Sequence, residues 1–295
     1  MPSRQPFTAL CRATAPTPAA ARCDLHVHTT HSDGAYTPAQ AVELARRSGL
    51  AALAVTDHDT LAAVAPARAV AAGTGLEIIP GVEISAEYRG RELHLLGYFI
   101  DPEDPRLTAE LERLRRHRVN RFWEMVERLR ACGVSLDEDE VRSRAGAGTL
   151  GRRHLAMLLV EARRVGSVHE AFRRYLGDRG RVTLPKVRLP VAEALALVGG
   201  AGGVASWAHP AGDCTRESLA ELRAWGLGAV EVEYPACRAG RRRELRALAA
   251  ELGLAVTGGS DCHGPGDFRR DVGACGVTGA ELEALRQSAP WRRGQ

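Results

Sequence analysis

The sequence predicts an α/β fold, an open parallel sheet or a barrel, interrupted by an inserted helical subdomain. Short apolar segments alternate with helical patterns in the first and last thirds of the chain, which is typical of a parallel sheet. The middle, residues 105–182, contains only helical periodicity. Polar residues with metal-binding side chains follow several predicted strands, as expected where a parallel sheet forms a site.

Apolar segments predict strands at residues 23–28, 50–56, 77–84, 92–100, 203–208, 229–233 and 254–257. Thr37 and Pro38 begin a helix, because threonine caps a helix and proline suits its first turn, and Gly49 ends it. A second helix is expected over residues 60–72, bent at Pro66. Further helices are expected between the later strands.

The middle of the chain begins with one long amphipathic helix. Its apolar residues recur three, four or eight positions apart on one face: Leu107, Leu111, Leu114, Phe122, Val126 and Leu129. Two more helices are expected over residues 150–165 and 168–176. Residues 105–182 contain eighteen arginines and eleven acidic residues, so this segment carries about +7 while the whole chain carries +4. We therefore expect a basic helical subdomain on a mildly acidic α/β body.

These patterns divide the chain into three parts. Residues 23–104 and 183–290 form the α/β body, and residues 105–182 form an insertion that we expect to be a substrate-binding cap. Residues 1–22 are rich in Arg, Ala, Pro and Thr, contain no acidic residue and lack the apolar core of a secretory signal. We expect a disordered tail there, with a transit peptide as the alternative.

Composition excludes several classes of protein. The 295 residues are 45% hydrophobic and 26% charged, the usual globular balance, and no run of eighteen apolar residues predicts a membrane-spanning helix. A net charge of +4 is too small to indicate a nucleic-acid partner by itself. The seven cysteines are scattered without a CxxC pair, which argues against a disulfide framework or a cysteine-based zinc site and favours a reducing cytoplasm.

Histidines and carboxylates gather at the ends of predicted strands. Nine of them are candidate metal ligands: His26, His28, Asp33, His58, Glu83, His94, His209, Asp261 and His263. Because the carboxyl ends of parallel strands meet at one face, we expect these side chains to converge. His26 and His28 are two apart on a strand and point to the same side. Collecting unpaired charges in one place is costly, and a bound cation would compensate that cost.

Nine ligands are too many for one ion with four to six positions, so two or three ions with a bridging carboxylate are expected. Imidazole with carboxylate favours Mn, Fe or Zn, with Mg possible, and Cys262 is expected to pack rather than to bind metal. A multinuclear centre can hold a hydroxide at neutral pH and clamp a phosphoryl group during in-line attack. The arginine-rich insertion fits an anionic substrate, with Arg152, Arg153 and Arg181 as candidate contacts.

These residues lie in motifs that resemble those of the PHP (polymerase and histidinol phosphatase) family. The motifs are Asp24-Leu25-His26-Val27-His28-Thr29, Ser32-Asp33-Gly34, Thr56-Asp57-His58-Asp59, Pro80-Gly81-Val82-Glu83-Ile84-Ser85, His94-Leu95-Leu96-Gly97-Tyr98, Ala208-His209-Pro210 and Gly259-Ser260-Asp261-Cys262-His263. They follow the family order over residues 23–265. The helical insertion is similar to that of the branch with 3',5'-nucleoside bisphosphate phosphatases and exoribonucleases acting on short 5'-phosphorylated RNA.

The resemblance implies a distorted (β/α)7 barrel with three metal ions. By this likeness His26, His28, Glu83 and Asp261 hold one ion, Glu83 bridges to a second held by His94 and His209, and Asp33, His58 and His263 hold the third. Gly151-Arg152-Arg153-His154 resembles an insertion motif in which an arginine and a histidine face the substrate, although Arg153 replaces a smaller residue. Relatives often have Gly-Arg after His-Pro, where this chain has Ala211-Gly212.

The resulting hypothesis is a metal-dependent phosphoesterase acting on 3',5'-bisphosphonucleotides or short 5'-phosphorylated RNA. Its partner is this small phosphorylated substrate, and nothing in the sequence indicates a membrane or a stable protein partner. The alternatives are a histidinol-phosphate phosphatase, a non-catalytic metal-binding module, and an amidohydrolase with a carbamylated lysine. The last is disfavoured because Lys186, the one lysine, lies in a proline-rich stretch and not beside a candidate ligand.

Overall fold

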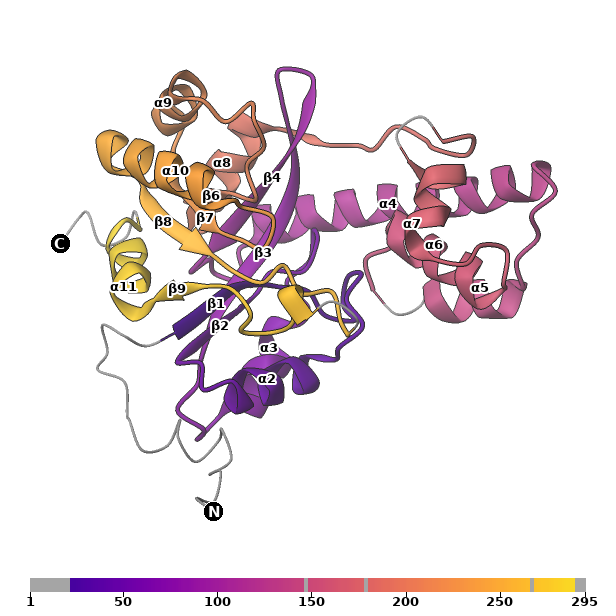
Figure 1. Ribbon diagram of the computed structural model, residues 1–295, viewed down its shortest axis with the longest axis horizontal. Helices are drawn as coiled ribbons and strands as arrows, with labels where there is room; N and C mark the ends of the chain where they lie inside the picture. Colours follow the sequence, from indigo (N-terminus) through magenta and orange to yellow (C-terminus); the bar gives the residue numbers. More distant parts are fainter. Residues whose placement is uncertain (1–21, 146–147, 178–179, 266–267, 290–295) are drawn as a thin grey trace, which may run out of the picture.

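The chain forms one strongly curved sheet with helices on its outside and a helical lobe beside it (Figure 1). The computed structural model describes residues 22–145, 148–177, 180–265 and 268–289. The predicted tail, except for Arg22, lies outside the described residues. The strands are β1 (Arg22–Val27), β2 (Ala52–Val55), β3 (Glu77–Tyr88), β4 (Arg91–Tyr98), β5 (Leu189–Pro190), β6 (Val204–Trp207), β7 (Leu227–Glu233), β8 (Ala255–Gly258) and β9 (Val277–Thr278).

The sheet order is β8-β7-β6-β4-β3-β2-β1-β9, with β5 paired to β3. The prediction of a parallel sheet is wrong for β4, which runs antiparallel to both β3 and β6. A two-residue turn, Arg89-Gly90, joins β3 to β4, and both residues have the positive φ that a tight hairpin requires. The sheet is nearly closed, because the backbone N–H of His28, just after β1, donates to Cys262 beyond β8 at 2.9 Å.

The helices of the body are α2 (Pro38–Arg47), α3 (Val64–Ala71), α8 (Val191–Gly200), α9 (Arg216–Ala224), α10 (Ala239–Leu252) and α11 (Gly279–Gln287). Thr37 caps α2 as predicted, accepting from the backbone N–H of Gln40. The second helix begins later than predicted, at Val64. Pro66 therefore lies in its first turn, where a proline removes no helical hydrogen bond, and the predicted bend is wrong.

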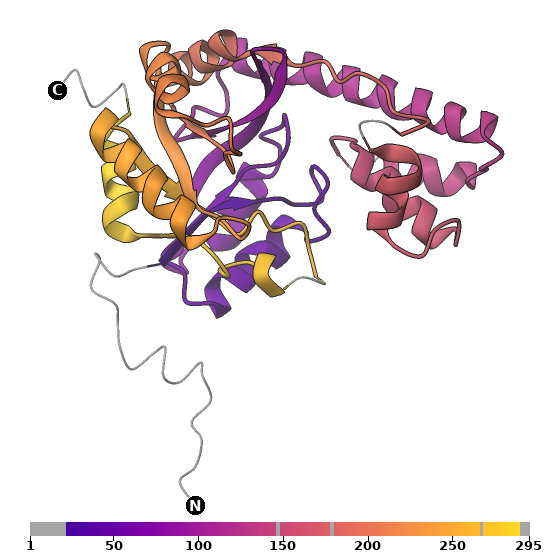
Figure 2. The same ribbon diagram turned by 45° about the horizontal axis from the view of Figure 1, so that its top comes forward.

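The lobe contains α4 (Pro105–Ala131), α5 (Glu138–Ala145), α6 (Arg152–Glu161), α7 (Val168–Ala171) and the π-helix η2 (Phe172–Leu176); a 3₁₀ turn, η3 (Phe268–Arg270), belongs to the body. Helix α4 extends from the body into the lobe (Figure 2). All six predicted apolar residues of this helix are buried. They belong to two hydrophobic cores: Leu107 and Leu111 pack in the core of the body, whereas Phe122 and Leu129 pack in the core of the lobe.

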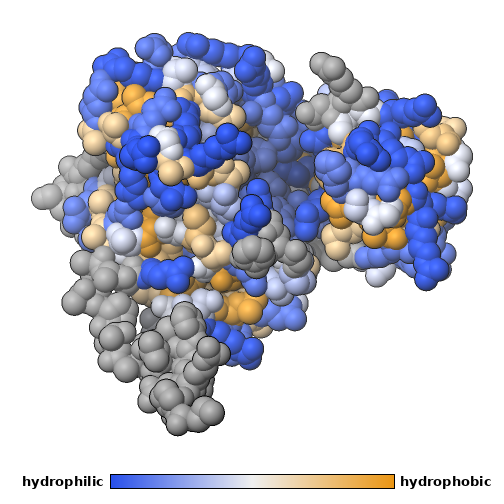
Figure 3. Space-filling view, in the orientation of Figure 1, coloured by the Kyte–Doolittle hydropathy of each residue, from blue (hydrophilic) through white to orange (hydrophobic). Residues whose placement is uncertain are grey.

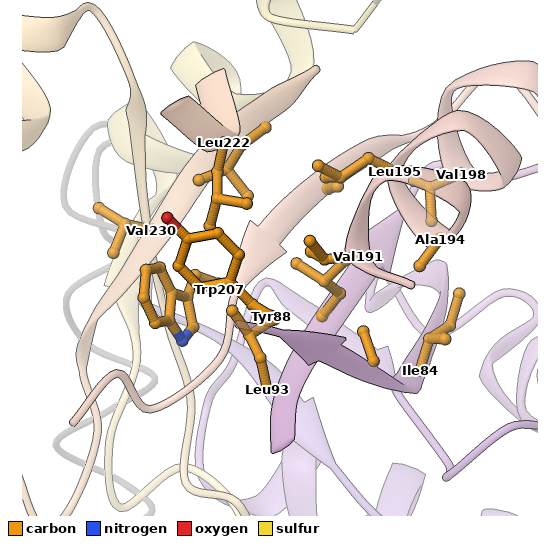
Figure 4. Close-up of a cluster of buried hydrophobic side chains, with 14 of the residues drawn as sticks. Ile84, Tyr88, Leu93, Val191, Ala194, Leu195, Val198, Trp207, Leu222 and Val230 are labelled. Carbon is orange, nitrogen blue, oxygen red and sulfur yellow. The ribbon is translucent and has the colours of Figure 1, made fainter. Parts of the chain in front are cut away.

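The body core on this side packs α8 against β3, β4 and β6. Figure 4 shows Val191, Ala194, Leu195 and Val198 of α8 facing Ile84 and Leu93, with Trp207 and Tyr88 beside them. This packing fixes the hairpin of β3 and β4, which supplies two of the nine candidate ligands. No helix in the described part of the chain has the length and apolarity needed to cross a membrane.

Candidate metal centre

All nine candidate ligands lie within or just after strands, at one face of the barrel. His26 is in β1, Glu83 in β3 and His94 in β4. The other six follow β1, β2, β6 and β8: His28, Asp33, His58, His209, Asp261 and His263. Glycine permits two close approaches there, because a Cβ on Gly34 would lie 2.4 Å from the carbonyl oxygen of His28, and one on Gly259 would lie 2.3 Å from the nitrogen of His26.

Glu83 is the centre of the cluster. Its side chain is 1% exposed, and its Oε1 lies 2.7 Å from Nδ1 of His94 and 3.1 Å from Nε2 of His209. Its Oε2 lies 3.0 Å from Nδ1 of His58 and 3.2 Å from Nε2 of His28. One buried carboxylate thus contacts histidines from four separate segments, which suits the bridging role that the resemblance implies.

Two further carboxylates complete the cluster. Oδ1 of Asp261 lies 3.4 Å from Nε2 of His28, 3.6 Å from Nε2 of His26 and 3.5 Å from Nδ1 of His263. Oδ1 of Asp33 lies 3.4 Å from Nε2 of His263 and 3.8 Å from Nε2 of His58. The structure therefore brings all nine predicted residues together in one continuous network.

This donor set fits divalent cations. Oδ1 of Asp33 and Nδ1 of His58 are buried and, despite their short distances to His263 and Glu83, make no hydrogen bond of good geometry in the described chain. Burial opposes ionisation of Glu83, yet His58 and His94 hold the pKa of Glu83 well below its usual range. Burial likewise disfavours the charged form of His28, yet Asp261 and Glu83 raise its pKa to about 10. The imidazoles and carboxylates at this centre therefore stabilise one another's charged forms where they touch, although burial and the neighbouring His28 lower the pKa of His58 to about 4.

Three overlapping groups have ligand atoms within 4.8 Å of one another: His26, His28 and Glu83; His58, Glu83 and His94; and His28, Asp33, His58 and His263. His28, His58 and Glu83 each belong to two groups, and of these three Glu83, with its two carboxylate oxygens, would be the residue able to serve two ions. The backbone is strained at the same place, since His209 and Asp261 have φ of 29° and 50°. Such strain costs about 1–3 kcal/mol per residue and is concentrated at functional sites.

Carboxylates outside the nine residues position parts of the cluster, and one of them, Glu231, was not predicted from the sequence. Oε1 of the fully buried Glu231 in β7 lies 3.0 Å from Nδ1 of His26, and its Oε2 accepts from the backbone N–H of His209. Asp57 accepts from the N–H and hydroxyl of Thr29 and from Ser32, which shapes the loop that carries Asp33. A carboxylate inside an apolar strand was the available signal for Glu231.

We expect Glu231→Gln to lower the affinity for divalent metal about 10- to 100-fold, because the carboxylate that fixes the His26 ring loses its charge. The measurement is a competition titration of bound Mn²⁺ against a chelator. Glu233→Gln is the matched control: it lies two residues along β7 and pairs with Arg242 and Arg246 outside the cluster. An unchanged affinity in the Glu231 variant would contradict this role.

Comparison with known proteins agrees with this geometry. A family model for the PHP domain matches residues 24–184, more than half of the chain. The chain belongs to the PHP domain family. A 3',5'-nucleoside bisphosphate phosphatase from Chromobacterium violaceum is 34% identical over 261 residues, which are 86% of this chain and 91% of that protein. A 5'-3' exoribonuclease from Haemophilus influenzae is 33% identical over 247 residues, which are 82% and 90% of the two chains.

A solved structure from Bifidobacterium adolescentis, described as a metal-dependent phosphoesterase, matches with a TM-score of 0.82 at 30% identity. The match covers 92% of this chain and 98% of that chain. Together these similarities confirm the predicted PHP-type α/β barrel and the predicted class of enzyme, a phosphoesterase.

Arg118 joins the lobe to the PHP barrel, and the sequence analysis did not single it out. It lies on α4, its side chain is 9% exposed, and its Nε donates to Oδ2 of Asp59 at 2.6 Å. Its Nη2 donates to the hydroxyl of Ser85 at 2.8 Å. A Cβ on Gly151, at the start of α6, would lie 3.7 Å from Nη1 of Arg118 and 3.9 Å from Oδ2 of Asp33. The start of α6 therefore lies at the edge of the metal centre.

The predicted substrate residues lie at this helix start, in different surroundings. Nδ1 of His154 accepts from the backbone N–H of Gly151 at 3.1 Å, so the buried imidazole caps the N-terminus of α6. Nη1 of Arg152 donates to the carbonyl of Leu176 inside the lobe. Nε of Arg153 is buried without a hydrogen-bond partner in the described chain. Arg181 is exposed.

Lys186 is separated from the candidate ligand His94 by one side chain, that of Glu92. Its Nζ lies 2.7 Å from Oε1 of Glu92, and the same oxygen lies 2.7 Å from Nε2 of His94. The segment after the lobe folds back onto α4, where Nε of Arg121 donates to the carbonyl of Leu184 at 2.9 Å. Sequence distance concealed this contact, since Lys186 and Glu92 are 94 positions apart.

Proposed function

We propose that this PHP phosphoesterase hydrolyses a phosphate ester of a nucleotide, a 3',5'-bisphosphonucleotide or the end of a short 5'-phosphorylated RNA. The observation that carries the proposal is the single network of nine histidines and carboxylates centred on Glu83. Relatives that are about one third identical over most of their length, a bisphosphate phosphatase and an exoribonuclease, support the substrate class.

We further propose that the nine residues bind two or three divalent ions, with manganese, iron or zinc favoured by the mixture of imidazole and carboxylate. When bound, such ions supply a nucleophile from water at neutral pH and neutralise charge on the phosphoryl oxygens. The chain's own part is to fix the ligands in place. Glu231 orients His26, Glu92 orients His94, and Asp57 shapes the loop that carries Asp33.

Beyond the metal centre, the side chains we propose for substrate binding belong to the lobe. Arg118 brings a guanidinium group to the edge of the centre, and Arg153 belongs to the first turn of α6, which begins there; we propose that both bind phosphate oxygens. A hydrophilic hollow separates lobe and barrel (Figure 3), which leaves room for a polar substrate. We therefore propose that residues 105–182 act as a substrate-binding cap.

The unpaired state of the described cysteines supports the proposal of a cytoplasmic location.

The test is a substrate panel with purified, Mn²⁺-loaded protein. It compares adenosine 3',5'-bisphosphate, a 5'-phosphorylated RNA trimer and histidinol phosphate at equal concentrations, with released phosphate and mononucleotide as the readouts. We expect turnover of the nucleotide or the RNA to exceed that of histidinol phosphate at least tenfold. Preference for histidinol phosphate would replace the proposed substrate, and absence of turnover on every phosphoester would refute the proposal.

A further inference from the structure

We propose that Lys186 is a specificity-determining residue that binds a second anionic group of the substrate, separate from the phosphate at the metal centre. This inference rests on the proposed function, because it concerns which phosphorylated substrate the same site takes. It would favour a nucleotide with two phosphates, or an RNA whose next phosphodiester reaches the lysine, over a substrate with a single phosphate.

The position of Lys186 separates it from the phosphate that would bind at Glu83. The two ring nitrogens of His94 face opposite ways: Nδ1 faces Glu83, and Nε2 faces Glu92. Lys186 contacts Glu92 on the outer side of this ring. The contact with Glu92 would therefore place an anion on the ammonium group at the Glu92 side of the His94 ring, while the phosphate at the metal centre lies at the Glu83 side.

The ammonium group is held in place and still has donors to offer. Its side chain is 14% exposed. An ammonium group has three N–H donors, and within the described chain Glu92 is its one hydrogen-bond partner. Because Glu92 already fixes the side chain, binding an anion costs little additional conformational entropy.

A second cation lies near Lys186. Arg118 donates to Ser85, which lies opposite His94 in the β3–β4 pairing, and Lys186 contacts Glu92 beside the same His94. Burial and the neighbouring Arg118 lower the pKa of the Lys186 amine to about 8, in agreement with this placement. Each is neutralised by a barrel carboxylate, Asp59 for Arg118 and Glu92 for Lys186. Arg118 uses Nε and Nη2 on the barrel, and its Nη1 has no hydrogen-bond partner in the described chain. Two fixed cations with unused donors form a site for a phosphate group.

The test compares substrates that differ by one phosphate. Mn²⁺-loaded wild type and Lys186→Met are assayed on adenosine 3',5'-bisphosphate and on adenosine 3'- and 5'-monophosphate. We expect Lys186→Met to lower kcat/KM for the bisphosphate about 10- to 100-fold, mainly through KM, because one charge-assisted hydrogen bond is lost. For the monophosphate that is hydrolysed, we expect a change below about threefold. Lys186→Arg should keep most of the activity on the bisphosphate.

Two variants separate this role from others. Arg188→Met removes a positive charge from the same segment, where Arg188 lies 3.7 Å from Glu87, and should leave the preference unchanged. Glu92→Gln disturbs His94 directly and should affect all substrates alike. An equal loss on both kinds of substrate in Lys186→Met would show that the lysine acts through Glu92 alone, and no loss on either would also overturn the proposal.

The inference and the proposed function fail separately. If none of the nucleotides is turned over, the proposed function is refuted. The same comparison is then made on the equilibrium affinities of the Mn²⁺-loaded protein, which remain measurable because nothing is consumed. A bisphosphate preference that depends on Lys186 would still support the inference, and a preference independent of Lys186 would refute it.

Discussion

Replacing Glu83 by glutamine is expected to lower kcat/KM about 1,000-fold or more, which corresponds to roughly 4 kcal/mol of lost transition-state stabilisation. The substitution keeps the shape of the side chain and removes one charge. Glu83 contacts the histidines of two candidate metal groups, so its neutralisation weakens both. The measurements are kcat/KM on the best nucleotide of the substrate panel and the number of metal ions bound per chain.

Glu87→Gln is the matched control for this variant. Glu87 lies four residues further along β3 and its side chain is 45% exposed. The same chemical change there should leave both measurements within about twofold of wild type. A Glu83→Gln enzyme with normal metal content and activity within tenfold of wild type would show that Glu83 is not the bridging residue.

Replacing Arg118 by methionine is expected to have the second largest effect. The change leaves Asp59, whose side chain is 1% exposed, without its guanidinium partner, and breaking such a buried pair costs about 3–5 kcal/mol. The side chain also connects the lobe to the barrel through Ser85. We therefore expect a lower free energy of unfolding in a denaturant titration, together with a fall in kcat/KM of about 100-fold.

A double variant separates stability from substrate binding. Asp59→Asn removes the unpaired charge, and asparagine tolerates the positive φ of 51° at this position. Arg118→Met/Asp59→Asn should recover most of the free energy of unfolding while kcat/KM stays low, since the guanidinium is still missing. Arg115→Met, on the same helix, removes a half-buried arginine that pairs with Glu112 and should change stability by less than about 0.5 kcal/mol. Full recovery of activity in the double variant would contradict a substrate role for Arg118.

The convergence of the candidate ligands was predictable because each position depends on a local pattern. A strand ends, a histidine or carboxylate follows, and parallel strands bring such ends to one face. From this pattern we correctly predicted that residues as distant in sequence as His26 and His263 lie together, since both contact Asp261. It missed the reversed direction of β4, since strand periodicity is the same in parallel and antiparallel pairs.

The residues around the ligands were harder to predict. Glu231, Arg118 and Lys186 act through partners 205, 59 and 94 positions away in sequence. No spacing rule links such pairs. The contact of Glu231 arises only when the sheet curves so that β7 and β1 approach, and those of Arg118 and Lys186 only when α4 and the segment after the lobe pack against the barrel. Helix periodicity correctly predicted that Leu107 and Phe122 are buried. It could not show that the two residues belong to different hydrophobic cores.

Anomalous X-ray scattering from crystals soaked in Mn²⁺ tests the central claim most directly. We predict at least two manganese peaks at the face where Glu83 lies, each about 2.0–2.3 Å from histidine nitrogens and carboxylate oxygens of the nine residues, with Glu83 touching two of them. Peaks that lie elsewhere, or nine side chains that bind no cation at saturating manganese, would contradict a shared metal centre.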